Sequence, residues 1–242
     1  MASFTVTGDI DPFLHVSLKH GEAIYAESNA MVMMESTLQL KGQMTGGFFR
    51  SLARRLTSGE SFFQQKIEAV NGNGDCLLSP TLPGGMQVLE VGNTQYTLTD
   101  GAFVAAETSV ELKIKTQGLG TALFGGTGGF FVMETAGNGK VVVSGFGSLF
   151  MLDVEPGRDV IIDNYHVVAW ESQLQHQITV ATGQGGFFGN LVSSVTSGEG
   201  MVLRFSGRGK VLIASRNRDN FVQWIRGEIG RVPGSQSITD RI

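Results

Sequence analysis

Three glutamates occupy similar sequence contexts and could bring carboxylates together. Glu27, Glu107 and Glu171 each follow a small or apolar residue and precede a serine or threonine. Carboxylates gathered around one axis can bind a cation or serve as a general acid and base. Duplication of a unit with a charged residue at a strand bend explains the same pattern without chemistry, and we favour this interpretation. We therefore assign no catalytic residue.

The four histidines lack the spacing of a metal site. A cupin-like site needs a His-x-His pair on one strand, a glutamate and a later histidine. His15 and His20 are five positions apart, and His166 and His176 lie in separate segments. The glycine-rich segments contain no Gly-Lys-Ser or Gly-Lys-Thr sequence typical of a phosphate loop. The sequence thus predicts neither a bound metal nor a cofactor.

The segment 48–56 is the strongest candidate for a contact surface. Its apolar residues recur with helical spacing, and its other face is basic. The residues proposed for this surface are Phe48, Phe49, Arg50, Arg54 and Arg55. This pattern fits docking to a protein partner or, weakly, to a membrane surface. A helix that plugs its own barrel also fits, and segment 187–195, which keeps the stripe without the arginines, favours that alternative.

The segments around these residues repeat along the chain and have the patterns of β-strands. Segment 137–144 (GNGKVVVS) returns as 207–214 (GRGKVLIA), and 72–79 is a looser copy. Segments 95–99, 111–115 and 175–180 alternate polar and apolar residues, as expected of strands with one buried face. The continuous apolar runs 141–143 and 211–213 predict strands that are buried on both faces. Three similar β-units are therefore expected.

The boundaries of these units follow from the order of the motifs. We expect one domain over residues 1–226, with repeats at about 22–100, 101–164 and 165–217. The third repeat lacks a closing hairpin, and the N-terminal hairpin 13–24 is predicted to supply it and to close the ring. A short helix is expected at 218–226, followed by a polar tail at 227–242.

Composition restricts the classes of function. The chain has 242 residues, a net charge of -4, one cysteine and 34 glycines. Its N-terminus has no secretory signal pattern, and no stretch is long and apolar enough to span a membrane as a helix. Basic residues gather between 204 and 218, but the overall acidity and the apolar neighbours of the aromatic residues argue against RNA as a partner. A cytoplasmic location is expected.

The motif combination resembles one protein family over residues 13–217. Gly-Gly-Phe-Phe, Thr-Ser-Gly-Glu, Gly-x-Gly with its apolar strand, and Ala-x-Glu are similar to the altered-inheritance-of-mitochondria protein 24 family. The resemblance implies an all-β fold like that of the tryptophan RNA-binding attenuation protein (TRAP): three pseudo-symmetric repeats in a closed barrel related to double-stranded β-helices. It implies no catalytic residues. The mitochondrial members are linked to inner-membrane organisation, but this chain shows no mitochondrial presequence.

We therefore expect a non-enzymatic scaffold or assembly protein that acts as a homo-oligomer. Two alternatives stay open: a module that binds a small molecule or RNA on the TRAP-like surface, and a cupin-like metalloenzyme.

Overall fold

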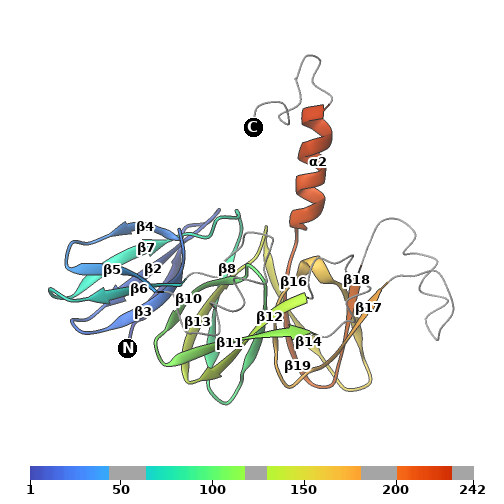
Figure 1. The fold of residues 1–242 in the computed structure, drawn as a ribbon. Coiled ribbons are helices and arrows are strands. Elements are labelled where there is room, and N and C mark those ends of the chain that lie inside the picture. The colour runs from blue at the N-terminus through green and yellow to red at the C-terminus, as the bar shows by residue number, and fades with distance from the viewer. Residues whose placement is uncertain (44–63, 118–129, 181–200, 231–242) are drawn as a thin grey trace.

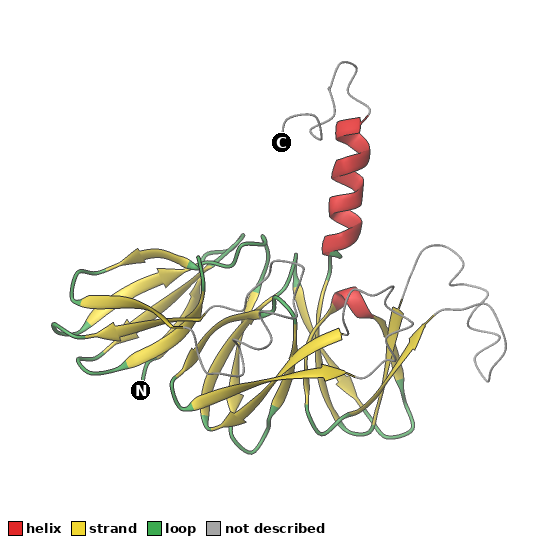
Figure 2. Cartoon of the chain, in the orientation of Figure 1, coloured by secondary structure: helices red, strands yellow, loops and turns green. Residues whose placement is uncertain are grey.

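The structure is a computed structural model that describes residues 1–43, 64–117, 130–180 and 201–230. Strands dominate these ranges and form four sheets that succeed one another along the molecule (Figure 1). In these described ranges, a short 3₁₀ turn and the long C-terminal helix accompany the strands (Figure 2). The predicted all-β class is thus confirmed.

The first two sheets contain strands β1 to β8 together with β10 and β13. The first sheet has the order β1-β2-β7-β4, and its strands are β1 (Ser3–Thr7), β2 (Phe13–Leu18), β7 (Gly74–Leu78) and β4 (Met31–Met34). The second has the order β5-β6-β3-β10-β13-β8, and its strands are β5 (Leu38–Gln43), β6 (Gln64–Ala69), β3 (Ala23–Glu27), β10 (Phe103–Glu107), β13 (Gly139–Ser144) and β8 (Met86–Val91).

The other two sheets contain β9, β11, β12 and strands β14 to β19. The third sheet has the order β11-β12-β9-β16-β19-β14, and its strands are β11 (Val110–Gln117), β12 (Phe130–Gly137), β9 (Tyr96–Thr99), β16 (Val167–Glu171), β19 (Gly209–Ala214) and β14 (Leu149–Val154). The fourth has the order β15-β18-β17, and its strands are β15 (Val160–Asp163), β18 (Met201–Ser206) and β17 (Gln175–Val180).

Three hydrophobic cores fill the spaces between consecutive sheets. Along β13, Val142 packs in the first core, whereas Val141 and Val143 pack in the second. Successive side chains of a strand point to opposite faces, so a strand between two cores needs an unbroken apolar run. This arrangement confirms the prediction for 141–143, where all three valines are fully buried.

Three sets of six strands share one order of pairing. In the first set β2, β7 and β4 form one half, while β5, β6 and β3 form the other. The sets β8–β13 and β14–β19 repeat this order. Neighbouring sets are joined because β3 pairs with β10 and β9 pairs with β16, both antiparallel.

This pairing corrects the expected place of the N-terminal hairpin. β2 pairs with β7, with Val16 opposite Cys76, so segment 13–24 lies in the first set and not in the third. The sets also begin earlier than the predicted repeats, because β8 and β14 are first strands of a set rather than closing hairpins. The described strands form open sheets, and no closed barrel is found among them.

The C-terminal helix α2 (Arg218–Gly230) projects away from the sheets (Figure 1). The Asn217 side chain accepts a hydrogen bond from the Asn220 amide at 3.0 Å, which starts the helix. Phe221 attaches the first turn, because its ring lies 5.1 Å from the Phe146 ring. The helix continues four residues beyond the predicted end at Arg226, so the predicted tail 227–242 begins as helix.

Candidate functional site

The residues predicted to form a contact surface lie outside the described part of the chain. Phe48, Phe49, Arg50, Arg54 and Arg55 belong to the connection between β5 and β6. The comparable segment 187–195 lies in the connection between β17 and β18 and is also outside the described residues. Whether the first segment docks or plugs therefore stays a prediction.

Two of the three predicted carboxylates occupy matching places. Glu107 ends β10 and Glu171 ends β16. Glu107 Oε2 accepts a hydrogen bond from the Lys140 amide at 2.9 Å, directly after the second glycine of the Gly-x-Gly turn. A Cβ on Gly139 would lie 2.7 Å from this oxygen, and one on Gly209 would lie 2.8 Å from Glu171 Oε2. The second glycine therefore makes room for a carboxylate that packs against the turn.

The third matching carboxylate is Glu35, not Glu27. Glu35 follows β4, and its Oε2 accepts a hydrogen bond from the Asp75 amide at 3.0 Å, again directly after a Gly-x-Gly turn. Glu27 ends β3, which belongs to the other half of its set. A buried aliphatic residue stands three positions after each matching carboxylate, namely Leu38, Val110 and Leu174. The buried Ala30 also follows Glu27 at this distance, so this sequence signal does not separate Glu35 from Glu27.

Glu27 has a distinct electrostatic environment. Burial raises the pKa of its carboxyl to about 7, and the negative charge of Asp100 adds to the effect. A carboxyl with this pKa can exchange a proton near neutrality. A general acid or base also needs a binding site beside it, and Glu27 does not line the groove described next.

A shallow groove of about 430 Å³ lies where the first two sets meet. Its lining includes Lys66, Glu68, Glu107 and Ser109. The amino group of Met1 pairs with Glu22 at its rim, and Lys66 Nζ lies 3.0 Å from Glu68 Oε2. Glu107 is buried, and its Oε1 has no hydrogen-bond partner among the described residues. The groove is thus polar, with one unpaired acceptor.

The histidines are held in separate local roles. His15 Nε2 lies 3.1 Å from Asp75 Oδ2, and His166 Nδ1 lies 2.7 Å from the Ala214 carbonyl oxygen. His176 packs on Trp170 with ring centroids 5.1 Å apart, and burial lowers its pKa. Over the described ranges, no three His, Cys, Asp or Glu side chains converge as metal ligands would.

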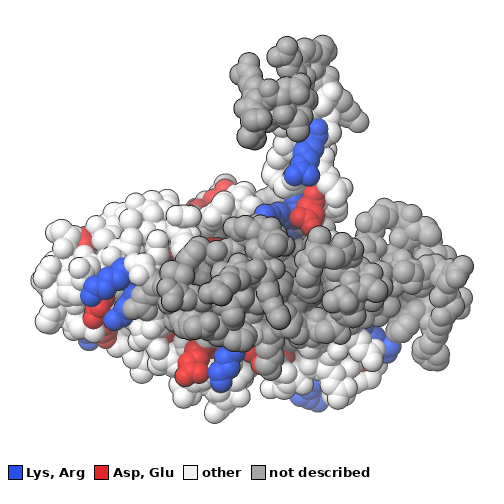
Figure 3. Space-filling model, in the orientation of Figure 1, with Lys and Arg blue, Asp and Glu red and all other residues white. Residues whose placement is uncertain are grey.

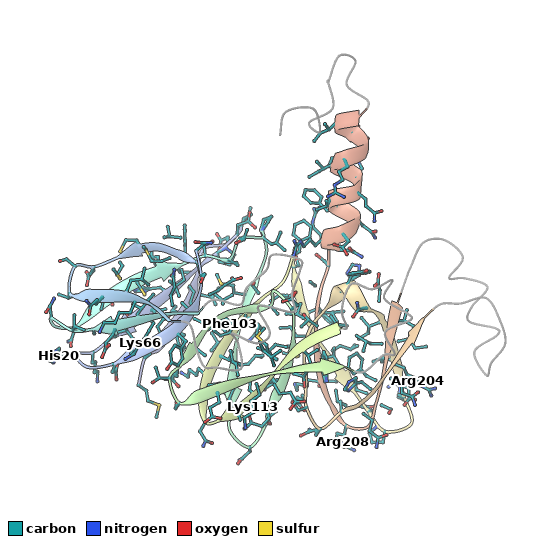
Figure 4. The ribbon with its side chains drawn as sticks, viewed as in Figure 1. His20, Lys66, Phe103, Lys113, Arg204 and Arg208 are labelled. Atoms are coloured by element: carbon teal, nitrogen blue, oxygen red, sulfur yellow. The ribbon has the colours of Figure 1, made fainter. Side chains whose placement is uncertain are left out.

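Basic and acidic side chains are interspersed on the described surface. Figure 3 shows Lys and Arg beside Asp and Glu on the face in view. Arg204 Nε donates to Asp159 Oδ2 at 2.8 Å, and Lys210 Nζ lies 3.4 Å from Asp153. Arg204 and Arg208 lie at the opposite end of the molecule from Lys66 and His20 (Figure 4). The basic residues of 204–210 are therefore partly neutralised by neighbouring carboxylates.

Two strands at opposite ends of the array expose apolar side chains that sequence reasoning missed. β4 shows Val32 and Met33 to solvent, with exposed fractions of 54% and 41%. β15 shows Ile161, with 45% exposed. In the described residues, β4 pairs only with β7 and β15 only with β18. The run Met31-Val32-Met33-Met34 was the available signal, because a natural edge strand normally carries charges or proline.

Comparisons with known proteins place the chain in a family. The model of the family described as "Mitochondrial biogenesis AIM24" matches residues 4–216. The chain belongs to the AIM24 family. It is 36% identical over 216 residues to an uncharacterised protein of Streptococcus pyogenes, covering 87% of this chain and 84% of that protein. A crystal structure of another Streptococcus pyogenes protein matches with a TM-score of 0.75 and 32% identity, covering 94% of this chain and all of that one.

These matches confirm the predicted family. In the described portion, no helix has the length and apolarity needed to cross a membrane.

Proposed function

We propose that this AIM24-family protein is a non-enzymatic assembly protein that works as a homo-oligomer in the cytoplasm. One observation carries the proposal: the apolar side chains of β4 and β15 are exposed, although side chains at corresponding strand positions within the array are covered. Exposed apolar strand edges are strong sites of association between chains. A protein that assembles with itself gives these edges a partner.

The proposed architecture supports this role. We interpret the three sets of six strands as repeats of one TRAP-like unit, joined edge to edge. In such an array each unit supplies one edge to its neighbour, and the two terminal units each retain an unused edge. A scaffold built from copies of this chain would use those edges.

Sedimentation velocity of the purified full-length chain over a range of concentrations tests the proposal. We expect a mass that is a multiple of the 25.9 kDa of one chain. A single species of 25.9 kDa up to high micromolar concentration would contradict self-assembly.

A second candidate is binding of a small cationic molecule in the groove beside Glu107. The buried, unpaired Oε1 of Glu107 favours it, because an unsatisfied acceptor costs about 1–3 kcal/mol that a donor could recover. A thermal-shift series with ammonium, spermidine and Ca²⁺ tests this candidate. Stabilisation that disappears in Glu107→Gln would support it, and the absence of any shift would reject it.

A further inference from the structure

We propose that copies of this chain join head to tail, with β4 of one copy pairing antiparallel with β15 of the next. This inference rests on the proposed self-assembly and specifies its interface. It would convert the first and fourth sheets of neighbouring copies into one continuous sheet, of the kind already formed twice inside the chain.

The internal junctions supply the template. At the first junction, Ala105 of β10 lies opposite Ala26 of β3, and Ala106 lies opposite Tyr25. At the second, Ala169 of β16 lies opposite Leu98 of β9, and Trp170 lies opposite Thr97. β4 occupies the place of β10 and β16 in the first set, and β15 occupies the place of β3 and β9 in the third.

Two structural features align the terminal strands β4 and β15 with the strands of the internal junctions. β4, β10 and β16 each carry a register shift on pairing, between Met31 and Met33, Phe103 and Ala105, and Val167 and Ala169. Met33 therefore corresponds to Ala105 and Ala169.

On the other edge, the landmark is the distance to the turn glycine, which the second and third sets share. In the first set the partner of Ala26, Gln65, stands seven residues before Gly72. Ile162 lies opposite Leu203 and Leu98 lies opposite Met133, and both partners stand four residues before the first glycine of a Gly-x-Gly turn. Ile162 thus corresponds to Leu98. The proposed register places Met33 opposite Ile162 and Met34 opposite Ile161.

Side chains at the interior junctions are less exposed than the side chains at the corresponding positions of β4 and β15. Val32 is 54% exposed, whereas Val104 and Val168 in the same strand position are 0% and 4% exposed. Ile161 is 45% exposed, whereas Thr97 at the same strand position is 3% exposed and Tyr25 is half-buried. The interior junctions cover these positions, so pairing of β4 with β15 would cover the exposed ones.

The apolar side chains of β4 also have a core to enter. Val104, Ala105 and Val142 of the second set pack in the core of the first set. Val168, Ala169 and Leu212 of the third set likewise pack in the core of the second. By correspondence, Val32, Met33 and the half-buried Leu77 of one copy would extend the core around Trp170 and Phe205 of the preceding copy.

The two surfaces of this interface differ, so the interface is heterologous. Repetition of one heterologous contact produces a closed ring or an open filament rather than a twofold dimer. Each copy therefore contributes one β4 edge and one β15 edge, and blocking either one in all copies removes every contact.

The test measures the mass of full-length variants with one blocked edge. Met33→Lys places a charge on β4, and Ile161→Lys places one on β15; both side chains are exposed, so the fold should be retained, as circular dichroism and the melting temperature would check. Phe150→Lys is the matched control, since Phe150 is exposed on the edge strand β14 outside the proposed contact. We expect both edge variants to fall to the mass of one chain, while the control keeps the wild-type mass.

Mixing the two edge variants makes the test specific. In an equimolar mixture, Met33→Lys supplies an unblocked β15 edge and Ile161→Lys supplies an unblocked β4 edge. We therefore expect a two-chain complex and nothing larger. Wild-type mass in both edge variants would overturn the β4–β15 interface while leaving self-assembly intact. A monomeric wild type would overturn both proposals.

Oxidative cross-linking checks the register. A Cys76→Ala background is needed, because Met34 lies opposite Cys76 in the same chain. In this background, Met34→Cys with Ile161→Cys should give a disulfide between chains, because directly opposed residues have Cβ atoms about 4.5–5.5 Å apart. Met34→Cys with Val160→Cys is the control that is one residue out of register, and it should cross-link at least tenfold less. Equal cross-linking of the two pairs would overturn the proposed register.

Discussion

The glutamate and the second glycine of each Gly-x-Gly turn form one structural unit. In the second set, Glu107 Oε2 accepts the Lys140 amide hydrogen, and Gly139 provides the space that the carboxylate occupies. The backbone of Gly139 has a φ of +143°, which L side chains rarely adopt. The carboxylate and the turn therefore recur together, as Glu107 with Lys140 and as Glu35 with Asp75.

Replacement of Glu107 tests this explanation. Glu107→Ala removes the acceptor of the Lys140 amide, and we expect it to lower the free energy of unfolding by about 2 kcal/mol. Glu107→Gln retains an amide oxygen that can accept the same bond, so it should cost clearly less. Urea unfolding of both variants, with the exposed Glu111→Ala as control, measures the difference. Equal losses in the alanine and glutamine variants would argue against the turn role.

The raised pKa of Glu27 predicts a pH-dependent stability. Below pH 4.5 the carboxyl is protonated in both the folded and the unfolded chain. Between pH 4.5 and about 7 it ionises only in the unfolded chain, so the free energy of unfolding falls as pH rises. This loss, which comes from the Glu27 carboxyl alone, is complete above about pH 7. Glu27 is only half-buried, and solvent screening reduces the effect to about 1 kcal/mol.

Glu27→Gln mimics the protonated carboxyl and should remove this loss. We expect the variant to be about 1 kcal/mol more stable than the wild type at pH 8 and similar to it at pH 4.5, measured by denaturant unfolding. Glu111→Gln, on an exposed side chain, is the control and should leave the pH profile unchanged. A Glu27→Gln profile parallel to that of the wild type would exclude a raised pKa at this site.

At the scale of elements, local pattern predicted strands and their faces but not their partners. The alternation in 111–115 and 175–180 corresponds to β11 and β17, and the run 141–143 lies within the doubly covered β13. The partner of β2 was misplaced, because apolar alternation reports which face is buried and not which strand lies alongside. Glu35 was missed for a related reason: β4 and β10 match by their register shift, which appears only once both are paired.

The loops between sets contact one another through their backbones, and the sequence did not predict these contacts. Gly84 has a φ of +150° and forms a parallel bridge with Gly147, and a Cβ there would overlap the backbone of Gly145 and Gly147. Gly84→Ala should therefore destabilise the chain by more than about 3 kcal/mol. Gly101→Ala is the control: its φ is +74° but nothing lies within 4 Å of the added Cβ, so about 1 kcal/mol is expected. Similar melting temperatures for the two variants would contradict this prediction.

At the scale of the whole molecule, the stacked sheets give a chain with covered interior junctions and two open ends. β10 and β16 pair on both sides, whereas β4 and β15 pair on one side in the described residues. Amides of doubly paired strands exchange slowly because exchange requires opening of a packed region. Amides on a free edge exchange without such opening.

Hydrogen exchange of the assembled wild type and of Met33→Lys can compare these strands directly. In the assembly we expect β4 and β15 to approach the protection of β10 and β16, because the intermolecular junction copies the interior ones. In Met33→Lys, β4 and β15 should both lose protection by at least tenfold, even though the substitution lies on β4 alone. β10 and β16 should be unchanged, which separates loss of the interface from general destabilisation. Loss of protection confined to β4, with β15 unaffected, would show that the two edges do not share one interface.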